Sequence, residues 1–129
     1  MAKSSKSILT VSDIHGGAGT AVCTLEPVIA DLNTTYKPNK LQLALNEAWY
    51  GCIDELEQKP TLLVVNGEPC DGGNRRQVGQ QSWSTNIQDQ LTDVSKLLSD
   101  IPYENLMFVR GSPYHDQLDA TNFEEIIAK

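Results

Sequence analysis

The sequence lacks any long apolar run. Of the 129 residues, the apolar stretch nearest the N-terminus ends after a few residues, at Ser12 and Asp13. A signal-peptide core needs roughly 7–15 apolar residues and a membrane-spanning helix about 20. We therefore expect a soluble, cytoplasmic protein with no membrane partner.

The chain also has little positive charge. Lys and Arg together number 10 against 17 Asp and Glu, which gives a formal net charge of −7, and no basic run is present. Such a chain is a poor candidate for binding a nucleic-acid backbone by charge alone. A bound divalent ion would reverse the charge locally, because such ions are often the largest charges in a site.

Cysteine is scarce as well. Cys23, Cys52 and Cys70 are odd in number, widely spaced and fit no zinc-knuckle pattern, so reduced thiols are expected. The sequence contains no internal repeat, low-complexity segment or shift in composition. At this length we expect residues 1–129 to form a single domain.

Short apolar runs alternate with helical patterns along the chain. The runs are continuous rather than alternating, which is typical of strands covered on both faces. The helical patterns place apolar residues at three- and four-residue steps, with Asn39 and Thr121 as candidate N-caps. The predicted strands are 7–11, 61–65 and 106–109, and the predicted helices are 40–56, 87–98 and 122–128.

This alternation favours an α/β fold with right-handed crossovers and a parallel sheet. The connection 16–38 shows little periodicity, and loops of that length inside compact domains are usually functional. Ligands of open parallel sheets lie beyond the carboxyl ends of the strands, so the residues that follow each strand matter most.

Carboxylates and both histidines of the chain follow the three strands. Asp13 and His15 come after the first strand, Glu68 and Asp71 after the second, and His115 with Asp116 after the third. In an Asp-x-His pair, alternate side chains point the same way and can bind one ion. Mixed oxygen and imidazole ligands suit Mn, Fe, Zn or Ni. A carboxylate at Glu68 could lie between two such ions, which together clamp a phosphoryl displacement.

Three blocks, SDIHGG, NGEPCDGG and VRGSPYHD, resemble in sequence and order the first blocks of the calcineurin-like metallophosphoesterases. The segments YKPNKLQLALNEAW and WSTNIQDQL make the chain similar to phage and prophage members. The resemblance covers nearly the whole chain. It implies a three-layer sandwich with a mostly parallel sheet, corresponding to the N-terminal half of the family's αββα fold, in a bacterial or phage-infected host cell.

The resemblance also implies residue roles. Asp13 and His15 would ligate the first divalent metal ion, and Glu68 would take the position of the bridging carboxylate. Asp71 would be a helper acid, and His115 would stand beside the scissile phosphate as proton donor or charge stabiliser. Ser112 is a weak ligand candidate, because the family's Asn after Gly is absent here.

Blander interpretations stand beside these roles. Asp13 and His15 could form a turn and a cap, Glu68 and Asp71 could be solvated loop acids, and His115 could be an ordinary loop histidine. The pair Arg75 and Arg76 could meet a substrate phosphate or could simply be exposed.

Two functions follow from the sequence. The first is hydrolysis of a phosphodiester or nucleotide by a dinuclear metal site. The alternative is a catalytically inactive phage or prophage binding protein, which associates with itself or with a host protein. The family's second half, which supplies further ligands and packs against the sheet, has no counterpart in these residues. A third reading is a piece of a longer enzyme. A partner that covers the exposed sheet is expected under the binding hypothesis.

Overall fold

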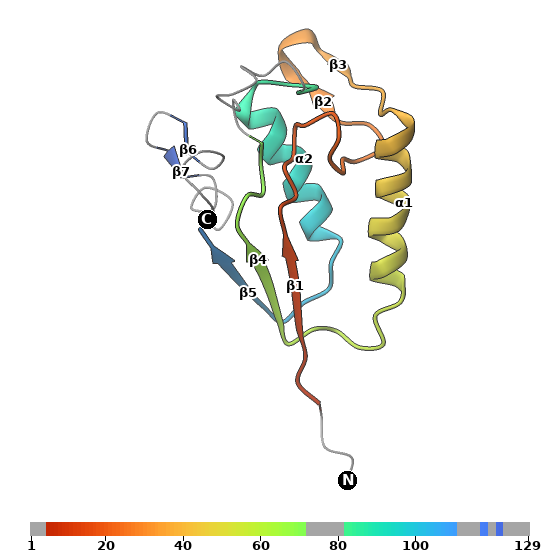
Figure 1. Ribbon diagram of the computed structural model, residues 1–129, viewed down its shortest axis with the longest axis vertical. Coiled ribbons are helices and arrows are strands. Elements are labelled where there is room, and N and C mark those ends of the chain that lie inside the picture. The colour runs from red at the N-terminus through yellow and green to blue at the C-terminus, as the bar shows by residue number, and fades with distance from the viewer. Residues whose placement is uncertain (1–4, 72–81, 111–116, 119–120, 123–129) are drawn as a thin grey trace.

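A computed structural model describes residues 5–71, 82–110, 117–118 and 121–122 of the chain. Its main sheet has three parallel strands, β1 (Ile8–Ser12), β4 (Leu62–Asn66) and β5 (Asn105–Val109), in the order β1-β4-β5. Helix α1 (Lys40–Asp54) connects β1 to β4, and helix α2 (Ile87–Ser99) connects β4 to β5 (Figure 1). The predicted α/β class, the three strands and the first two helices are confirmed within one or two residues.

Smaller elements complete the described chain. A two-stranded antiparallel ribbon, β2 (Val28–Ile29) and β3 (Thr34–Thr35), encloses the short 3-10 helix η1 (Ala30–Leu32). A second ribbon pairs β6 (Gln117–Leu118) with β7 (Thr121–Asn122). The predicted start of a third helix at Asn122, capped by Thr121, is therefore wrong, because both residues belong to a strand. The rest of that prediction, 123–128, lies outside the described residues.

Side-chain caps explain where the two helices begin. The Asn39 side chain accepts a hydrogen bond from the Gln42 amide at 2.9 Å, and the Gln42 side chain accepts one from the Asn39 amide at 3.0 Å. This reciprocal capping box satisfies two backbone donors that the first turn leaves without a helical partner. The predicted cap at Asn39 is confirmed. Asn86 caps α2 in a simpler way, accepting from the Gln88 amide.

The core lies between the central strand and α2. Leu63 and Val65 of β4 are fully buried, and they pack with Leu91, Val94 and Leu98 of α2. The register places Leu9 and Leu106 beside Leu63, and Val11 and Phe108 beside Val65. Since side chains alternate along a strand, these residues share the helix-covered face of the sheet.

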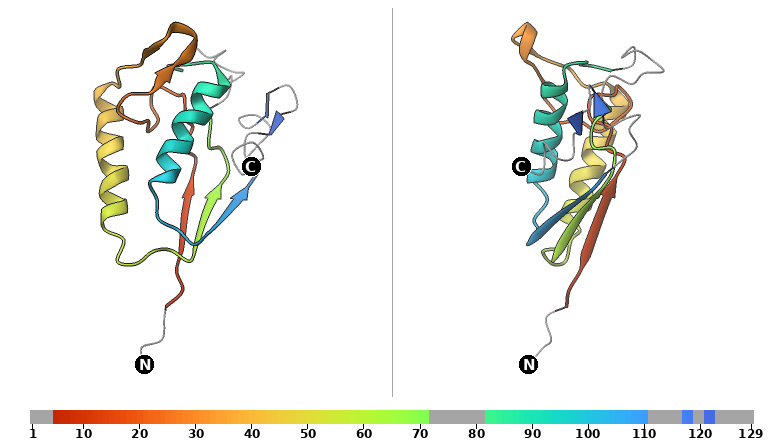
Figure 2. Two further views of the ribbon diagram at one scale, coloured as in Figure 1. Left: turned by 180° about the vertical axis from the view of Figure 1, so that it is seen from behind. Right: turned by 90° about the vertical axis from the view of Figure 1, so that its left-hand side faces the viewer.

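The described elements form two layers. Both crossovers run in the same direction across the sheet, which brings the two helices to the same side. Figure 1 shows α2 behind the strands and α1 beside β1, and Figure 2 shows α2 in front when the molecule is seen from behind. The opposite face carries Ile8, Met107 and Val109, which are 69%, 48% and 40% exposed. The prediction of strands covered on both faces therefore does not hold for the described residues.

Buried polar side chains of the helices hold the long connection between β1 and α1. On α1, the buried Asn46 donates to the carbonyl oxygen of Cys23 at 2.9 Å. On α2, the buried carboxylates of Asp89 and Asp93 accept from the backbone amides of Ala30 and Thr24 at 3.2 and 3.1 Å. Because buried polar groups require partners, these contacts fix the segment together with its own buried apolar residues, such as Ile14 and Cys23. Within the described residues, no helix is long and apolar enough to cross a membrane.

Candidate metal centre

The site lies where the chain leaves β1 and β4. The two loops run side by side and extend the parallel pairing of these strands past their ends, through an isolated bridge between Gly16 and Cys70. Four backbone hydrogen bonds join them: Asp13 N to Gly67 O (3.3 Å), His15 N to Glu68 O (3.0 Å), Gly16 N to Pro69 O (2.9 Å) and Asp71 N to Gly16 O (2.9 Å). The relative position of the loops is therefore set by backbone contacts.

Three residues of these loops adopt left-handed backbone conformations. Asp13, His15 and Glu68 have φ angles of 54°, 51° and 52°, and Asn33 is the other non-glycine residue with positive φ in the described chain. L-residues rarely adopt this region, and such conformations concentrate at functional sites because the surrounding structure must enforce them. Here the paired loops enforce them.

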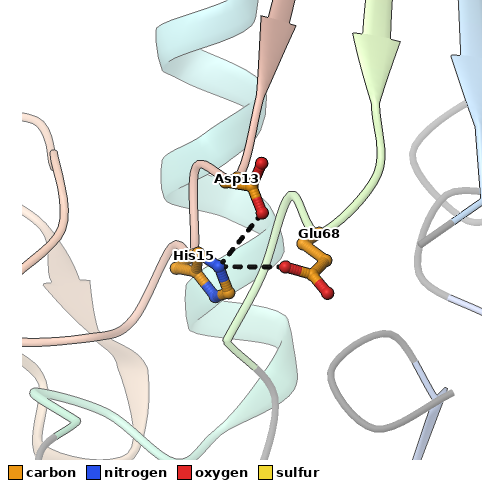
Figure 3. Close-up of side chains that lie close together, drawn as sticks. All are labelled: Asp13, His15 and Glu68. Atoms are coloured by element: carbon orange, nitrogen blue, oxygen red, sulfur yellow. Dashed lines mark ion pairs between the residues drawn. The ribbon is translucent and has the colours of Figure 1, made fainter. Parts of the chain in front are cut away.

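The left-handed turns bring three side chains to one point. His15 Nε2 lies 3.1 Å from Glu68 Oε2 and 3.6 Å from Asp13 Oδ1 (Figure 3). One ligand atom from each residue can be chosen so that all three lie within 4.8 Å of one another. The structure thus gathers the three residues that the resemblance implies as metal ligands.

Asp71 contacts the other nitrogen of the imidazole. Its Oδ1 lies 3.4 Å from His15 Nδ1, while its Oδ2 accepts from the Ser82 hydroxyl at 3.4 Å. The Asp71 side chain is buried, whereas that of Asp13 is 62% exposed. Sequence reasoning missed Ser82, which follows no strand and lies in no recognisable motif.

The surroundings of His15 and Asp13 shift the pKa values of these two residues. The hydrogen bond to Asp71 raises the pKa of His15, supported by the charge of Glu68 and opposed by burial. The contact with Glu68, followed by the Ser12 hydroxyl, lowers the pKa of Asp13. The raised pKa of His15 has the sign expected beside carboxylates, and the lowered pKa of Asp13 has the sign expected where hydrogen bonds stabilise the ionised carboxylate. The cluster therefore favours a cation.

The donor set fits a divalent ion. Two carboxylates and one imidazole, supplied by fixed loops, correspond to the three protein ligands of many catalytic metal sites, which leave a position open. The carboxylate against the second imidazole nitrogen matches the outer contact that orients a metal-binding histidine. The side chains that the structure describes are therefore suitable ligands for a divalent ion.

The remaining candidates are not placed. Ser112, His115, Asp116, Arg75 and Arg76 lie outside the described residues. Trp49, whose position in the helical pattern favours a core role, is half-buried and packs against the core cluster.

No protein-family model, curated protein or solved structure matches the chain. The family resemblance therefore rests on the three sequence blocks themselves. The geometry of the site brings together side chains that could hold a metal ion, and it does not specify a family.

Proposed function

We propose that this protein is a metal-dependent phosphoesterase whose site is formed by Asp13, His15 and Glu68. The observation that carries the proposal is the two-sided contact of the His15 imidazole. Its Nε2 faces Glu68 and Asp13, and its Nδ1 faces the buried Asp71. A histidine held by a carboxylate on one nitrogen and aimed at a carboxylate pair with the other has the arrangement of a metal ligand.

Each residue has a separate task in this proposal. Asp13 and Glu68 supply anionic oxygens, and His15 supplies a neutral nitrogen once it has lost its second proton. Asp71 keeps a proton on Nδ1, which leaves the Nε2 lone pair free for the ion. A bound Mn, Ni, Fe or Zn ion supplies Lewis acidity toward a phosphoryl oxygen.

The finer parts of the proposal come from the resemblance. A dinuclear centre would use Glu68 as the bridging carboxylate, and the chain would correspond to half of the family's sandwich. His115 and Ser112 would complete the site from the third loop, with Arg75 and Arg76 near the substrate phosphate. A phosphodiester or nucleotide is the expected substrate class.

Calorimetric titration of the metal-free protein with Mn²⁺ tests the proposal directly. Wild-type protein is expected to bind, and His15→Ala is expected to lose binding, since the imidazole contacts both carboxylates. Hydrolysis of an activated phosphodiester with Mn²⁺ or Ni²⁺ follows as the activity test. Turnover that survives both Asp13→Ala and His15→Ala would refute the proposal.

A second candidate function is supported by the open face of the sheet. Ile8, Met107 and Val109 are exposed on that face, which no described helix covers. Exposed apolar patches on sheets mark association sites, so the protein would act by binding itself or a host protein. Analytical ultracentrifugation of wild type and Met107→Lys tests self-association: a stable oligomer weakened by the substitution supports it, and a monomer at high concentration contradicts it.

A further inference from the structure

A cavity opens between α1 and β1, next to the candidate metal centre. It has a volume of about 760 Å³ and is lined mainly by apolar side chains. Leu9 and Val11 form the wall on the sheet side, and Leu45, Trp49 and Ile53 form the wall on the helix side. The helical stripe that the sequence predicts therefore faces a cavity as much as a packed core.

The cavity stays open because polar contacts, rather than apolar packing, hold the N-terminal half of α1. The two buried residues of this helix are Gln42 and Asn46. Gln42 donates to the carbonyl oxygen of Ala18 at 3.3 Å, and Asn46 donates to that of Cys23. Both acceptors belong to the long connection after β1, so this segment stands between the start of α1 and the sheet. The apolar side chains one and two turns closer to the C-terminus of α1 then line the cavity.

One end of the cavity is polar. Asp13, His15 and Asp71 line it together with the apolar walls, so the candidate metal centre and the cavity share a boundary. A molecule bound across this boundary would meet charged ligands at one end and apolar side chains along the rest of its length. Pockets of roughly 300–1,000 Å³ with a few polar groups at one end are typical small-molecule sites.

We propose that this cavity binds the apolar alcohol portion of the substrate, so that the substrate is an amphipathic phosphoester. The inference rests on the proposed function for the position of the phosphoryl group, and on the cavity alone for the apolar portion. The mainly apolar walls favour an alkyl or aryl group over a sugar or nucleoside, because few of the lining side chains could pair with the hydroxyls of a sugar.

The chain carries a reporter for this site. Cys52 is an exposed thiol in the cavity wall, while Cys23 and Cys70 are buried. Burial also raises the pKa of Cys23 to about 12, which keeps that thiol unreactive. Modification by an uncharged maleimide should therefore report selectively on Cys52.

The first experiment measures the rate of Cys52 modification in the full chain with Mn²⁺ present. Dodecyl phosphate is expected to slow the reaction by about tenfold or more at saturation, and methyl phosphate is not. No protection by dodecyl phosphate, or equal protection by both compounds, would overturn the inference. Protection that rises with protein concentration in the absence of ligand would also overturn it, because a second copy of the chain would then fill the cavity.

The second experiment uses the uncharged fluorescent amine N-phenyl-naphthylamine without any metal. Saturable binding at one site is expected. Ala48→Phe, which adds a ring to the cavity wall, should weaken binding by about tenfold or more. The control is Leu41→Gln, an exposed apolar position on α1 that does not line the cavity, and it should leave binding unchanged. Unchanged binding in Ala48→Phe would refute the assignment.

These measurements separate the two proposals. Binding of the uncharged probe by a protein that does not bind Mn²⁺ would refute the metal centre and leave the apolar site standing. Binding of Mn²⁺ by a protein that does not bind the probe would refute the role of the cavity and leave the metal centre standing.

Discussion

The Asp71 carboxylate lies against the Nδ1 side of the His15 imidazole, with Oδ1 at 3.4 Å from that nitrogen. The two residues come from different loops, which follow β1 and β4, and the Gly16 to Cys70 bridge holds those loops together. Because Asp71 is buried and His15 is only partly so, the carboxylate acts as the fixed partner and the imidazole is oriented by it.

Asp71→Asn should weaken Mn²⁺ binding by roughly 10–100-fold, the usual cost of losing an outer contact to a metal ligand. The amide has nearly the same shape and its oxygen can still accept a hydrogen bond from Nδ1, so the expected loss comes from the removed charge. Calorimetric titration measures the change. Asp54→Asn, at an exposed position on α1, is the matched control and should bind as wild type does. Equal affinities in the two variants would show that the charge of Asp71 does not strengthen metal binding by His15.

Metal binding should depend on pH through His15. Its pKa is raised above the ordinary 6.5, chiefly by Asp71, so a proton competes with the ion up to a higher pH than usual. Mn²⁺ affinity should therefore rise with pH until the folded-state pKa of His15 is passed. In Asp71→Asn the midpoint of this rise should move to lower pH. A midpoint that stays in place would assign the titration to another group.

The same shift predicts how the metal-free protein responds to pH. A raised pKa means that protonated His15 stabilises the fold. This contribution is fully present below the ordinary value of 6.5 and is lost as pH rises through the folded-state value. Thermal unfolding of wild type and His15→Ala across this range should give a difference that shrinks with rising pH. A constant difference would contradict the prediction.

Gly16→Ala should destabilise the protein by about 1–3 kcal/mol, the usual cost of overpacking. A Cβ at this position would lie 2.2 Å from Cγ2 of Val94, a buried residue of α2, and 3.3 Å from the carbonyl oxygen of Pro69. Chemical denaturation measures the loss. Gly51→Ala is the control, because a Cβ there meets no atom within 4 Å, and alanine in a helix should stabilise slightly. Equal effects of the two substitutions would rule out the close approach.

Asp93→Asn should stabilise the protein at neutral pH. Burial raises the pKa of Asp93 even though Thr24 donates two hydrogen bonds to its carboxylate. A carboxyl with a raised folded-state pKa destabilises the fold above that value, and this cost vanishes below the ordinary 3.8. The asparagine variant should therefore unfold at a higher temperature near neutral pH and show no such advantage in acid. A lower unfolding temperature at neutral pH would mean that the Thr24 contacts outweigh burial.

The three strands of the main sheet and the helices α1 and α2 were predictable from local pattern. Continuous apolar runs marked the three strands, three- and four-residue spacing marked α1 and α2, and Asn39 marked a helix start. The spacing of apolar residues in a helix did not predict what their side chains would contact. The apolar side of α1 lines a cavity, because buried polar residues of the same helix hold it against a loop.

The long connection was not predictable beyond its lack of periodicity. Its anchors are polar side chains 59 and 69 positions away, such as Asp89 for Ala30 and Asp93 for Thr24. A pattern of neighbouring residues cannot reveal contacts between residues so far apart in the sequence. The meeting of Asp13, His15 and Glu68 followed from their places after adjacent parallel strands. Their left-handed backbone did not, because residues other than glycine adopt positive φ only where the surrounding structure enforces it.

The left-handed φ of 52° at Glu68 lowers the stability of the fold, and the same residue supplies a side chain of the candidate site. Such a conformation costs about 1–3 kcal/mol for a side chain of this kind, whereas glycine adopts it freely and loses only about 0.5–1 kcal/mol through its flexibility. Glu68→Gly should therefore raise the unfolding temperature while it removes a ligand. A library of variants screened for heat resistance alone would be enriched in proteins that had lost the candidate metal centre.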